Sequence, residues 1–269
     1  MKPSSRDKNK TILLILSLAV IVEALVILRL LPQKPTKVAP PPKVVKPAGI
    51  AKIAIVLDDW GYNLNNIGYL DKIKQPLTIS VLPHLPYSRT VAYEAKRRGL
   101  EVILHLPLEP YPSEKVRLEA NTVMTNMSQA NVKAILEDDL DNVTGVAGVS
   151  NHMGSKATGD SRLMGIIFKE IKEKNLYFLD SVVSGKSIAF SLSRKMNVKF
   201  AKRDVFLDNS SDPAYIKGQI NRLKAAAKRQ GYALGIGHDR PNTLMVLQEV
   251  MPRLEEEGYK FVFVSELAR

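Results

Sequence analysis

The stretch KIAIVLDDWGYN, residues 52–63, is an apolar run that ends at two adjacent carboxylates, Asp58 and Asp59. Removing a carboxylate from water is costly unless it is paired, hydrogen-bonded or bound to a metal, and two adjacent carboxylates also repel each other. A buried strand that ends in such a pair therefore predicts a site whose chemistry needs both acids.

The bulk composition is that of a globular domain preceded by a basic N-terminal part. The chain has 269 residues, 45% of them hydrophobic, and a formal charge of +12. Residues 1–50 contain nine Lys or Arg against Asp7 and Glu23, which accounts for +7 of that charge. Because a membrane anchor and a linker explain this excess, nucleic acid is not predicted as a partner. The absence of cysteine excludes disulfides, cysteine-ligated zinc and thiol catalysis.

Residues 11–31, TILLILSLAVIVEALVILRLL, form a nearly continuous apolar stretch, and about 20 such residues cross a bilayer as a helix. The stretch is longer than the apolar core of a cleavable signal peptide, so we expect an uncleaved transmembrane anchor. Glu23 lies within it, and protonation or a partner helix would lower the cost of its burial. The basic tail 1–10 predicts a cytoplasmic N-terminus, a single pass through the inner (cytoplasmic) membrane and a periplasmic or extracellular remainder. The Pro- and Lys-rich segment 32–49 is predicted to be an extended linker to a folded domain, 50–269.

Residues 50–269 alternate short β-like runs with helical stretches. Strands are predicted at 52–57, 77–82, 101–105, 145–150, 176–180, 203–207, 232–237 and 260–264, and helices at 64–73, 88–98, 128–141, 161–174, 187–197, 213–230 and 242–256. This alternation predicts an α/β fold with parallel strands and helices outside them. Seven or eight such units in about 220 residues favour a complete or incomplete (β/α) barrel over an open doubly wound sheet.

Polar residues follow the predicted strands one after another. In parallel α/β folds, ligands bind beyond the carboxyl ends of the strands. The polar residues at these positions are Asp58, Asp59, His84, His105, Glu109, Asn151, His152, Asp180, Asp208 and His238. All four histidines of the chain are among them, which predicts that distant segments meet at one site.

Several of these residues also have a purely structural explanation. His84 lies between prolines, where hydrogen bonds to backbone carbonyls account for a turn histidine, so it is left out of the predicted metal set. Glu109 follows His105 by four residues, a helical ligand spacing, but two nearby prolines argue against a helix and make a loop cap an equal alternative. Asp180 and Asp208 complete this second set of candidates, since each can also cap a helix or pair with lysine.

Two imidazoles and one carboxylate form an open site for zinc or a similar divalent ion. Asp59 is predicted to hold such an ion, which leaves Asp58 to take the proton of the attacking water. His238 is predicted to protonate a leaving group or to stabilise an oxyanion. Competing motifs are weaker, because no G-x-S-x-G elbow occurs and the run SGKS at 184–187 lacks the first glycine of a phosphate loop.

Five blocks, IAIVLDDWGYN, HLPLEP, NHMGS, FLDS and GIGHDRPNTL, resemble in order and spacing the divergent polysaccharide deacetylase family, distant relatives of the NodB-homology carbohydrate esterases. The resemblance covers about residues 50–269. It implies a distorted barrel and the metal-dependent removal of acetyl groups from N-acetylated sugars. It also implies that Asp58 is the base, Asp59 a metal ligand and His238 the acid.

The second family motif departs from its usual form in this chain. That motif supplies two histidines four residues apart, whereas the corresponding stretch here has His105 and Glu109. The predicted metal triad is therefore Asp59, His105 and His152, with Glu109 as a substitute and zinc as the expected ion. The usual arginine–proline motif is not evident either.

Two functions follow from this reading. The first is a membrane-anchored, envelope-facing deacetylase of peptidoglycan or a related glycan, with envelope proteins as further candidate partners. The second is a catalytically inactive glycan-binding or scaffold protein that keeps the fold, which the altered second motif favours. Under either, Trp60, Tyr62 and Asn151 are predicted to bind the sugar, although aromatic packing in the mouth of the barrel explains Trp60 and Tyr62 equally well.

Overall fold

The computed structural model describes residues 50–114 and 116–269. The predicted basic tail (1–10), membrane anchor (11–31) and linker (32–49) lie outside these residues. Within the part that the structure describes, no helix combines the length and the apolar character needed to cross a membrane.

The strands and longer helices are β1 (Lys52–Trp60), β2 (Thr78–Val81), α2 (Ser88–Arg97), β3 (Glu101–Leu108), α3 (Gln129–Asn142), β4 (Gly148–Met153), α4 (Ser161–Glu173), β5 (Tyr177–Asp180), α5 (Ala189–Met196), β6 (Phe200–Lys202), β7 (Val205–Phe206), α6 (Pro213–Gln230), β8 (Tyr232–His238), α7 (Pro241–Glu256) and β9 (Lys260–Phe261). Short 3-10 turns complete them at η1 (Ile67–Tyr69), η2 (Pro112–Glu114), η3 (Ala157–Gly159) and η4 (Val264–Glu266).

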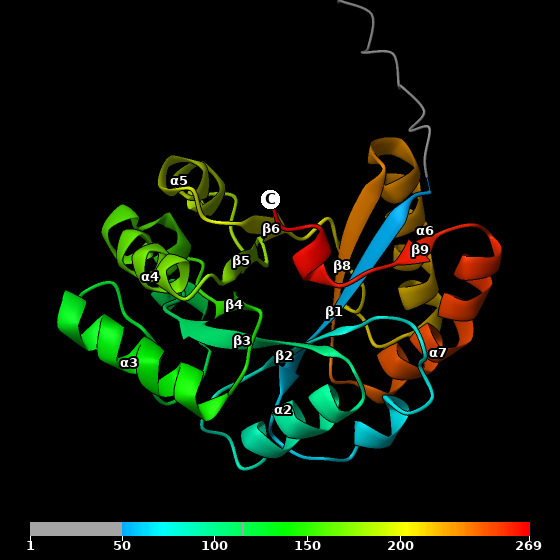
Figure 1. The fold of residues 1–269 in the computed structure, drawn as a ribbon, viewed down its shortest axis with the longest axis horizontal. Helices are drawn as coiled ribbons and strands as arrows, with labels where there is room; N and C mark the ends of the chain where they lie inside the picture. Colours follow the sequence, from blue (N-terminus) through cyan, green and yellow to red (C-terminus); the bar gives the residue numbers. More distant parts are fainter. Residues whose placement is uncertain (1–49, 115) are drawn as a thin grey trace, which may run out of the picture. The chain divides into compact units, whose positions relative to one another are not determined.

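All strands belong to one parallel sheet, in the order β6-β5-β4-β3-β2-β1-β8-β7, with β9 beside the start of β1 (Figure 1). The strands β6 and β7 lie at opposite ends of this order, although only Arg203 and Asp204 separate them in the chain. The sheet must therefore curl until its edges come close together. The prediction of an α/β fold with parallel strands is confirmed, and the predicted barrel is present in part, as a curled sheet. The barrel is open, however, because these two edge strands do not pair with each other.

Two segments bridge the open side of the curl. Arg203 donates to the carbonyl oxygens of Ser181 (2.7 Å) and Val182 (2.9 Å), just after β5, and its guanidinium lies 3.7 Å from the centre of the Phe206 ring in β7. The C-terminal segment, red in Figure 1, pairs with β1 through β9 and then exchanges backbone hydrogen bonds of 3.0 and 3.1 Å between Arg269 and Phe200 of β6. These contacts hold the two arms of the curved sheet together without a closed ladder of hydrogen bonds.

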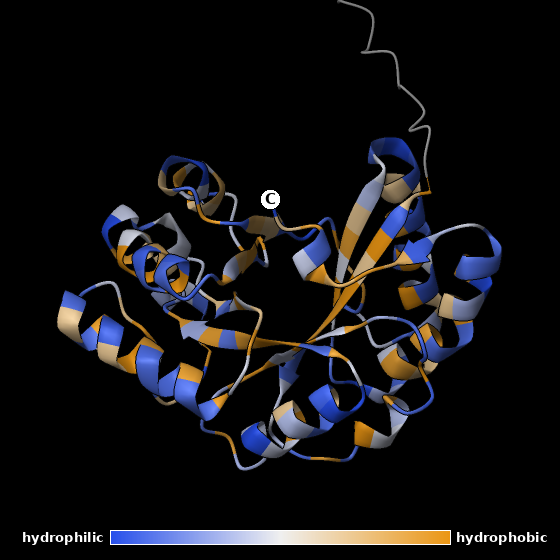
Figure 2. Ribbon diagram, in the orientation of Figure 1, coloured by the Kyte–Doolittle hydropathy of each residue, from blue (hydrophilic) through white to orange (hydrophobic). Residues whose placement is uncertain are grey.

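Alternate residues of each strand enter two separate apolar clusters, as the period of two in a strand requires. In β1, Ile53, Ile55 and Leu57 join the large cluster that includes the helices, whereas Ala54 and Val56 join a smaller cluster inside the curve. Figure 2 shows hydrophobic residues along the strands and a mixture of hydrophilic and hydrophobic residues along the helices. The inner cluster therefore defines the face of the sheet from which a site can be built.

The predicted helix 64–73 and the predicted strand 203–207 differ clearly from the structure, and the predicted strand 260–264 is shortened to β9. The predicted helix 64–73 is reduced to the 3-10 turn η1, because asparagines at 63, 65 and 66 favour turns, and the side chain of Asn63 accepts a hydrogen bond from the Asn65 N–H (2.9 Å). The predicted strand 203–207 is divided at the seam: residues 205–206 form β7, and a separate strand, β6, occupies 200–202.

Candidate active site

The inner face of the curved sheet carries polar residues at the carboxyl ends of four strands. Every second residue of these strands points to the inner face, where the apolar ones form the inner cluster. The polar residues at the ends of the same series are Asp58 in β1, His105 in β3, His152 in β4 and His238 in β8. Strands β1 and β8 are paired in the register Asp58↔His238, and β3 and β4 are also paired. Four segments that are distant in the chain thus end on one side of the same surface.

Asp59 reaches this face only because β1 is irregular at that point. In a regular strand its side chain would point to the face opposite that of Asp58. Its φ of 65° and the register shift against β2 between Leu57 and Trp60 mark a bulge that redirects the side chain. As a result, His105 Nε2 lies 3.3 Å from Asp59 Oδ1 and 3.7 Å from Asp58 Oδ2, so both acids face the same imidazole.

Asp59, His105 and His152 bring one ligand atom each within 4.8 Å of one another. The shortest of these contacts is 3.1 Å, between Asp59 Oδ1 and His152 Nδ1, and the two imidazole rings meet edge to face with centroids 4.9 Å apart. Burial acts to raise the pKa of Asp59, but the two imidazoles outweigh it and hold that pKa well below its usual range. An ionised carboxylate with two imidazole nitrogens is a donor set that fits Zn²⁺ or a similar divalent ion.

Two serines, Ser150 and Ser80, hold the His105 ring in place. His105 Nδ1 lies 2.8 Å from Ser150 Oγ, and Ser150 Oγ lies 2.8 Å from Ser80 Oγ in the buried interior. Such contacts to the second ring nitrogen orient a ligand histidine and select its tautomer. Sequence reasoning missed both serines, although Ser150 precedes His152 by two residues and so shares its face of β4.

Asp58 is almost completely removed from solvent, with 2% of its surface exposed. Its Oδ1 atom has no hydrogen-bond partner among the residues that the structure describes. Burial raises the pKa of Asp58, the charge of His105 opposes this rise, and the charge of Asp59 adds to it. A carboxylate in this environment binds a proton more readily than an ordinary aspartate, as a general base requires.

His238 is held by Asp208, which follows β7. The Asp208 carboxylate accepts hydrogen bonds from the backbone N–H of His238 (2.9 Å) and from Thr243 Oγ1 (2.7 Å), and it lies 2.7 Å from His238 Nδ1. Burial acts to lower the pKa of His238, but Asp208 outweighs it and raises that pKa. The other ring nitrogen, Nε2, lies 4.0 Å from Asp59 Oδ2, so its proton is available on the side of the metal triad.

Comparisons with known proteins show the family to which the chain belongs. The family model described as divergent polysaccharide deacetylase matches residues 55–268. This chain belongs to the divergent polysaccharide deacetylase family. The uncharacterized protein YibQ of Escherichia coli K12 is 38% identical over 208 residues, which is 77% of this chain. The match covers 65% of YibQ, so this chain spans less than two thirds of that relative.

Two solved structures show how far the fold is shared beyond the family's sequences. The uncharacterized protein ATU2773 from Agrobacterium tumefaciens C58 has a TM-score of 0.78 at 21% identity, over 82% of this chain and 91% of that one. The family 4 acetyl xylan esterase from Clostridium thermocellum, solved with a cobalt ion, has a TM-score of 0.51 at 16% identity, over 80% of this chain and 89% of that one. The fold of this deacetylase-family chain is therefore related to that of carbohydrate esterases.

The second set of predicted residues lies in other contacts. Glu109 accepts hydrogen bonds from the Thr125 N–H and Oγ1 (both 2.6 Å) and pairs with Lys156 Nζ (2.6 Å), so its carboxylate serves as a loop anchor. Asp180 accepts hydrogen bonds from the Val182 N–H (2.8 Å) and Ser187 Oγ (2.6 Å), which holds the turn after β5. Neither joins the metal triad of this family member, and Asp208 reaches the site only through His238.

Two of the three predicted sugar-binding residues need correction. Trp60 is fully buried in the large apolar cluster, so its ring packs in the core and has no surface for a sugar to stack on. Asn151 is also buried, and its side chain joins the Ser181 N–H (2.9 Å) to the Met153 carbonyl oxygen (2.7 Å). Tyr62 is 46% exposed and its hydroxyl donates a hydrogen bond to Glu119, so sugar binding by its ring stays a prediction.

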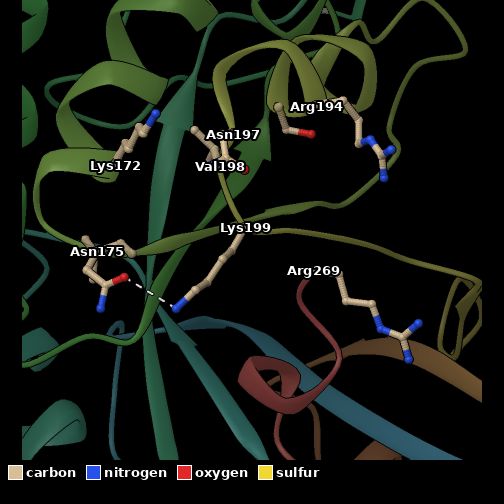
Figure 3. A pocket seen from close by; sticks show the side chains of 9 residues that line it. Lys172, Asn175, Arg194, Asn197, Val198, Lys199 and Arg269 are labelled. Atoms are coloured by element: carbon tan, nitrogen blue, oxygen red, sulfur yellow. Dashed lines mark hydrogen bonds between the residues drawn. The ribbon is translucent and has the colours of Figure 1, made fainter.

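A cavity of about 630 Å³ lies at the end of the strands opposite the candidate active site (Figure 3). Its lining includes Asn175, two residues before β5, and Lys199, the residue before β6, whose side chains are joined by a 3.3 Å hydrogen bond. Lys172, Arg194 and Arg269 complete its basic rim. None of the predicted deacetylase residues lines it, because those residues follow the carboxyl ends of their strands.

Proposed function

We propose that this chain is a metal-dependent hydrolase that removes acetyl groups from an N-acetylated polysaccharide, with peptidoglycan or a related envelope glycan as the substrate. One observation carries the proposal: the ligand atoms of Asp59, His105 and His152 converge within 4.8 Å, next to a buried acid, Asp58, whose Oδ1 has no hydrogen-bond partner among the described residues. Membership of the divergent polysaccharide deacetylase family and the fold shared with an acetyl xylan esterase support the same reaction class.

Each residue of the site has a separate role in the proposed reaction. A divalent cation held by Asp59, His105 and His152 would polarise the acetyl carbonyl and acidify a water molecule. Asp58 takes the proton of the attacking water, and its raised pKa suits this role. His238 donates its Nε2 proton to the amine nitrogen as the C–N bond breaks, and Asp208 stabilises the imidazolium before the transfer. The products are acetate and the free amino sugar.

The test is acetate release from N-acetylated glycan oligosaccharides by the Zn²⁺-loaded protein. We expect turnover by the wild-type protein and a loss of about 10²- to 10⁴-fold in Asp58→Asn, which removes the base but keeps the side-chain shape. Asp141→Asn, an exposed change on α3, is the matched control and should retain full activity. Turnover that survives both Asp58→Asn and His152→Ala would contradict the proposal.

The altered second motif favours a second candidate, a protein that binds the glycan without hydrolysing it. Glu109 stands where the family's usual second histidine is expected, and it is engaged with Lys156 and Thr125. The same preparation distinguishes the two functions. Glycan binding by the Zn²⁺-loaded wild-type protein, measured by calorimetry, without any acetate release would support this candidate and reject the enzyme.

The sequence of the N-terminal part supports a proposal for the location of the protein. We propose that residues 11–31 anchor it in the inner (cytoplasmic) membrane and that the domain acts on the exported side, where the envelope glycan lies. An alkaline phosphatase fused after residue 269 should be active, because that enzyme folds only outside the cytoplasm, and it should fractionate with membranes. An inactive fusion would overturn the proposed orientation, and release into the soluble fraction would overturn the anchor.

A further inference from the structure

The fourth histidine belongs to a different cluster of side chains. His84 lies in the loop between β2 and α2, and its Nε2 atom is 3.2 Å from Asp138 Oδ2 and 3.1 Å from Asp139 Oδ1. Both acids come from the C-terminal part of α3. One ligand atom from each of the three residues lies within 4.8 Å of the other two, a convergence shared by the proposed catalytic triad. The loop is held in this position by a 2.9 Å hydrogen bond from the His84 N–H to the side-chain oxygen of Asn142.

Asp139 is the unusual member of the cluster. It is 0% exposed, and neither of its carboxylate oxygens has a hydrogen-bond partner within residues 50–114 and 116–269. His84 approaches one oxygen without the alignment of a hydrogen bond. Buried carboxylates are otherwise paired, hydrogen-bonded or bound to metals, because removing the charge from water is costly. A buried acid that lacks hydrogen bonds and faces an imidazole and a second carboxylate indicates that a cation completes the group.

The helix adds to the negative potential at this point. The last turn of α3 contains acidic residues and no basic one, and the C-terminus of a helix carries a partial negative charge of its own. The distances also fit a shared ion. Ligands at about 2.0–2.2 Å from a tetrahedral or octahedral ion lie about 2.9–3.5 Å from each other, and the observed contacts of 3.1 and 3.2 Å fall in this range.

We propose that His84, Asp138 and Asp139 form a second divalent-cation site that fixes the loop after β2 to the end of α3. One imidazole with two carboxylates suits Zn²⁺ better than Ca²⁺, which prefers oxygen ligands alone. Asp138 is largely exposed and His84 is 26% exposed, so an ion can enter from solvent. The site is structural in character, because it joins two elements of the fold and contains none of the residues assigned to acetyl transfer to water.

The test uses the full chain with Asp59→Asn and His152→Ala, which removes two ligands of the catalytic triad and leaves the second cluster intact. Zn²⁺ alone is the probe, titrated by calorimetry and counted by elemental analysis after dialysis. We expect this double variant to retain one bound equivalent of Zn²⁺ and to lose it when His84→Ala is added. Adding Asp141→Asn instead, an acid on the same helical turn outside the cluster, should leave the bound equivalent in place.

A second measurement separates loss of the site from loss of the fold. In the same background, Asp139→Asn removes the buried charge while keeping its shape, so the metal-free protein should melt at the same or a higher temperature. The increase in melting temperature that Zn²⁺ causes should disappear. A double variant that binds no Zn²⁺, or one whose bound Zn²⁺ is unaffected by His84→Ala, would overturn the proposal and leave an ordinary histidine–carboxylate contact. Neither result depends on whether the protein hydrolyses a glycan.

Discussion

The two adjacent acids of β1 differ in burial and charge because of one backbone irregularity. Asp58 follows the regular alternation of the strand and is buried, whereas Asp59 has a φ of 65° at the bulge and turns toward two imidazoles. The consequences for their pKa values are opposite, because burial dominates at Asp58 and the imidazoles dominate at Asp59. One side chain is thereby prepared to accept a proton and the other to remain charged.

Asp58 should destabilise the fold at neutral pH. The pKa of Asp58 in the folded state lies above the ordinary value of 3.8, because burial favours the protonated carboxyl. The stability gained from that protonation is fully present below pH 3.8 and is lost as the pH rises through the folded-state pKa. Asp58→Asn should therefore raise the melting temperature of the metal-free protein at pH 7, by about 2–4 °C for each kcal/mol gained, and have no effect near pH 3. Thermal unfolding at both pH values measures this, with Asp141→Asn as the control. A lower melting temperature at pH 7 would show that Asp58 is stabilised by contacts other than those seen.

Glu109 should have the opposite pH dependence. Burial acts to raise its pKa, but Lys156 and Thr125 outweigh it and lower that pKa below 4.5. Its contribution is present above pH 4.5 and is lost as the pH falls through the folded pKa. We expect Glu109→Gln to cost about 1–3 kcal/mol at pH 7 and progressively less in acid, measured by urea unfolding across that range. Glu137→Gln, an exposed change, should cause no comparable loss, and a cost for Glu109→Gln that is constant with pH would rule out this explanation.

The strands position the site through their alternation of faces. In each strand, every second residue points to the inner face, and this series ends at Asp58, His105, His152 and His238. The series can be read from the sequence once the strands are known. The ends of the elements were predicted less well than their order. Strands β1 and β3 extend beyond the predicted residues 57 and 105, since their polar and proline-containing ends still pair with neighbouring strands. The bulge at Asp59 could not be predicted, because it arises from the fit of β1 against β2.

Gly237 in β8 is needed beside the Asp208–His238 pair. A Cβ atom at this position would lie 2.9 Å from Thr243 Cγ2 and 3.6 Å from Asp208 Oδ2. Gly237→Ala should displace Thr243, weaken its hydrogen bond to Asp208 and cost about 1–3 kcal/mol of stability through overpacking. Acetate release should fall while Zn²⁺ binding is retained, because the metal ligands lie on other strands. Gly165→Ala on α4 is the matched control, since a Cβ there meets nothing within 4 Å. Equal activity in the two variants would contradict this role for Gly237.

The curled sheet brings the metal ligands from β1, β3 and β4 to one place. Because these ligands meet only in the folded state, binding of a cation should increase the free energy of unfolding. At a Zn²⁺ concentration about 100 times the dissociation constant, the gain is about 2.7 kcal/mol per site, or about 5–11 °C in melting temperature. The shift should be smaller in Asp59→Asn than in the wild-type protein and should be reversed by EDTA. Equal shifts in the two proteins would mean that Zn²⁺ does not bind the triad.

The amino-acid sequence by itself determined the class of the fold and predicted which polar residues the fold brings together. Periodic hydrophobicity is a local property, so it predicted the order of strands and helices, and the placement of polar residues after strands predicted Asp58, Asp59, His105, His152 and His238 as neighbours. Only the tertiary structure decided which atoms meet. It left the barrel open at the seam between β6 and β7, buried Trp60 and Asn151, engaged Glu109 with Lys156, and placed His84 against two acids of α3. These outcomes depend on the packing of segments that are distant in the chain. Local sequence patterns do not show which of these distant side chains will be in contact.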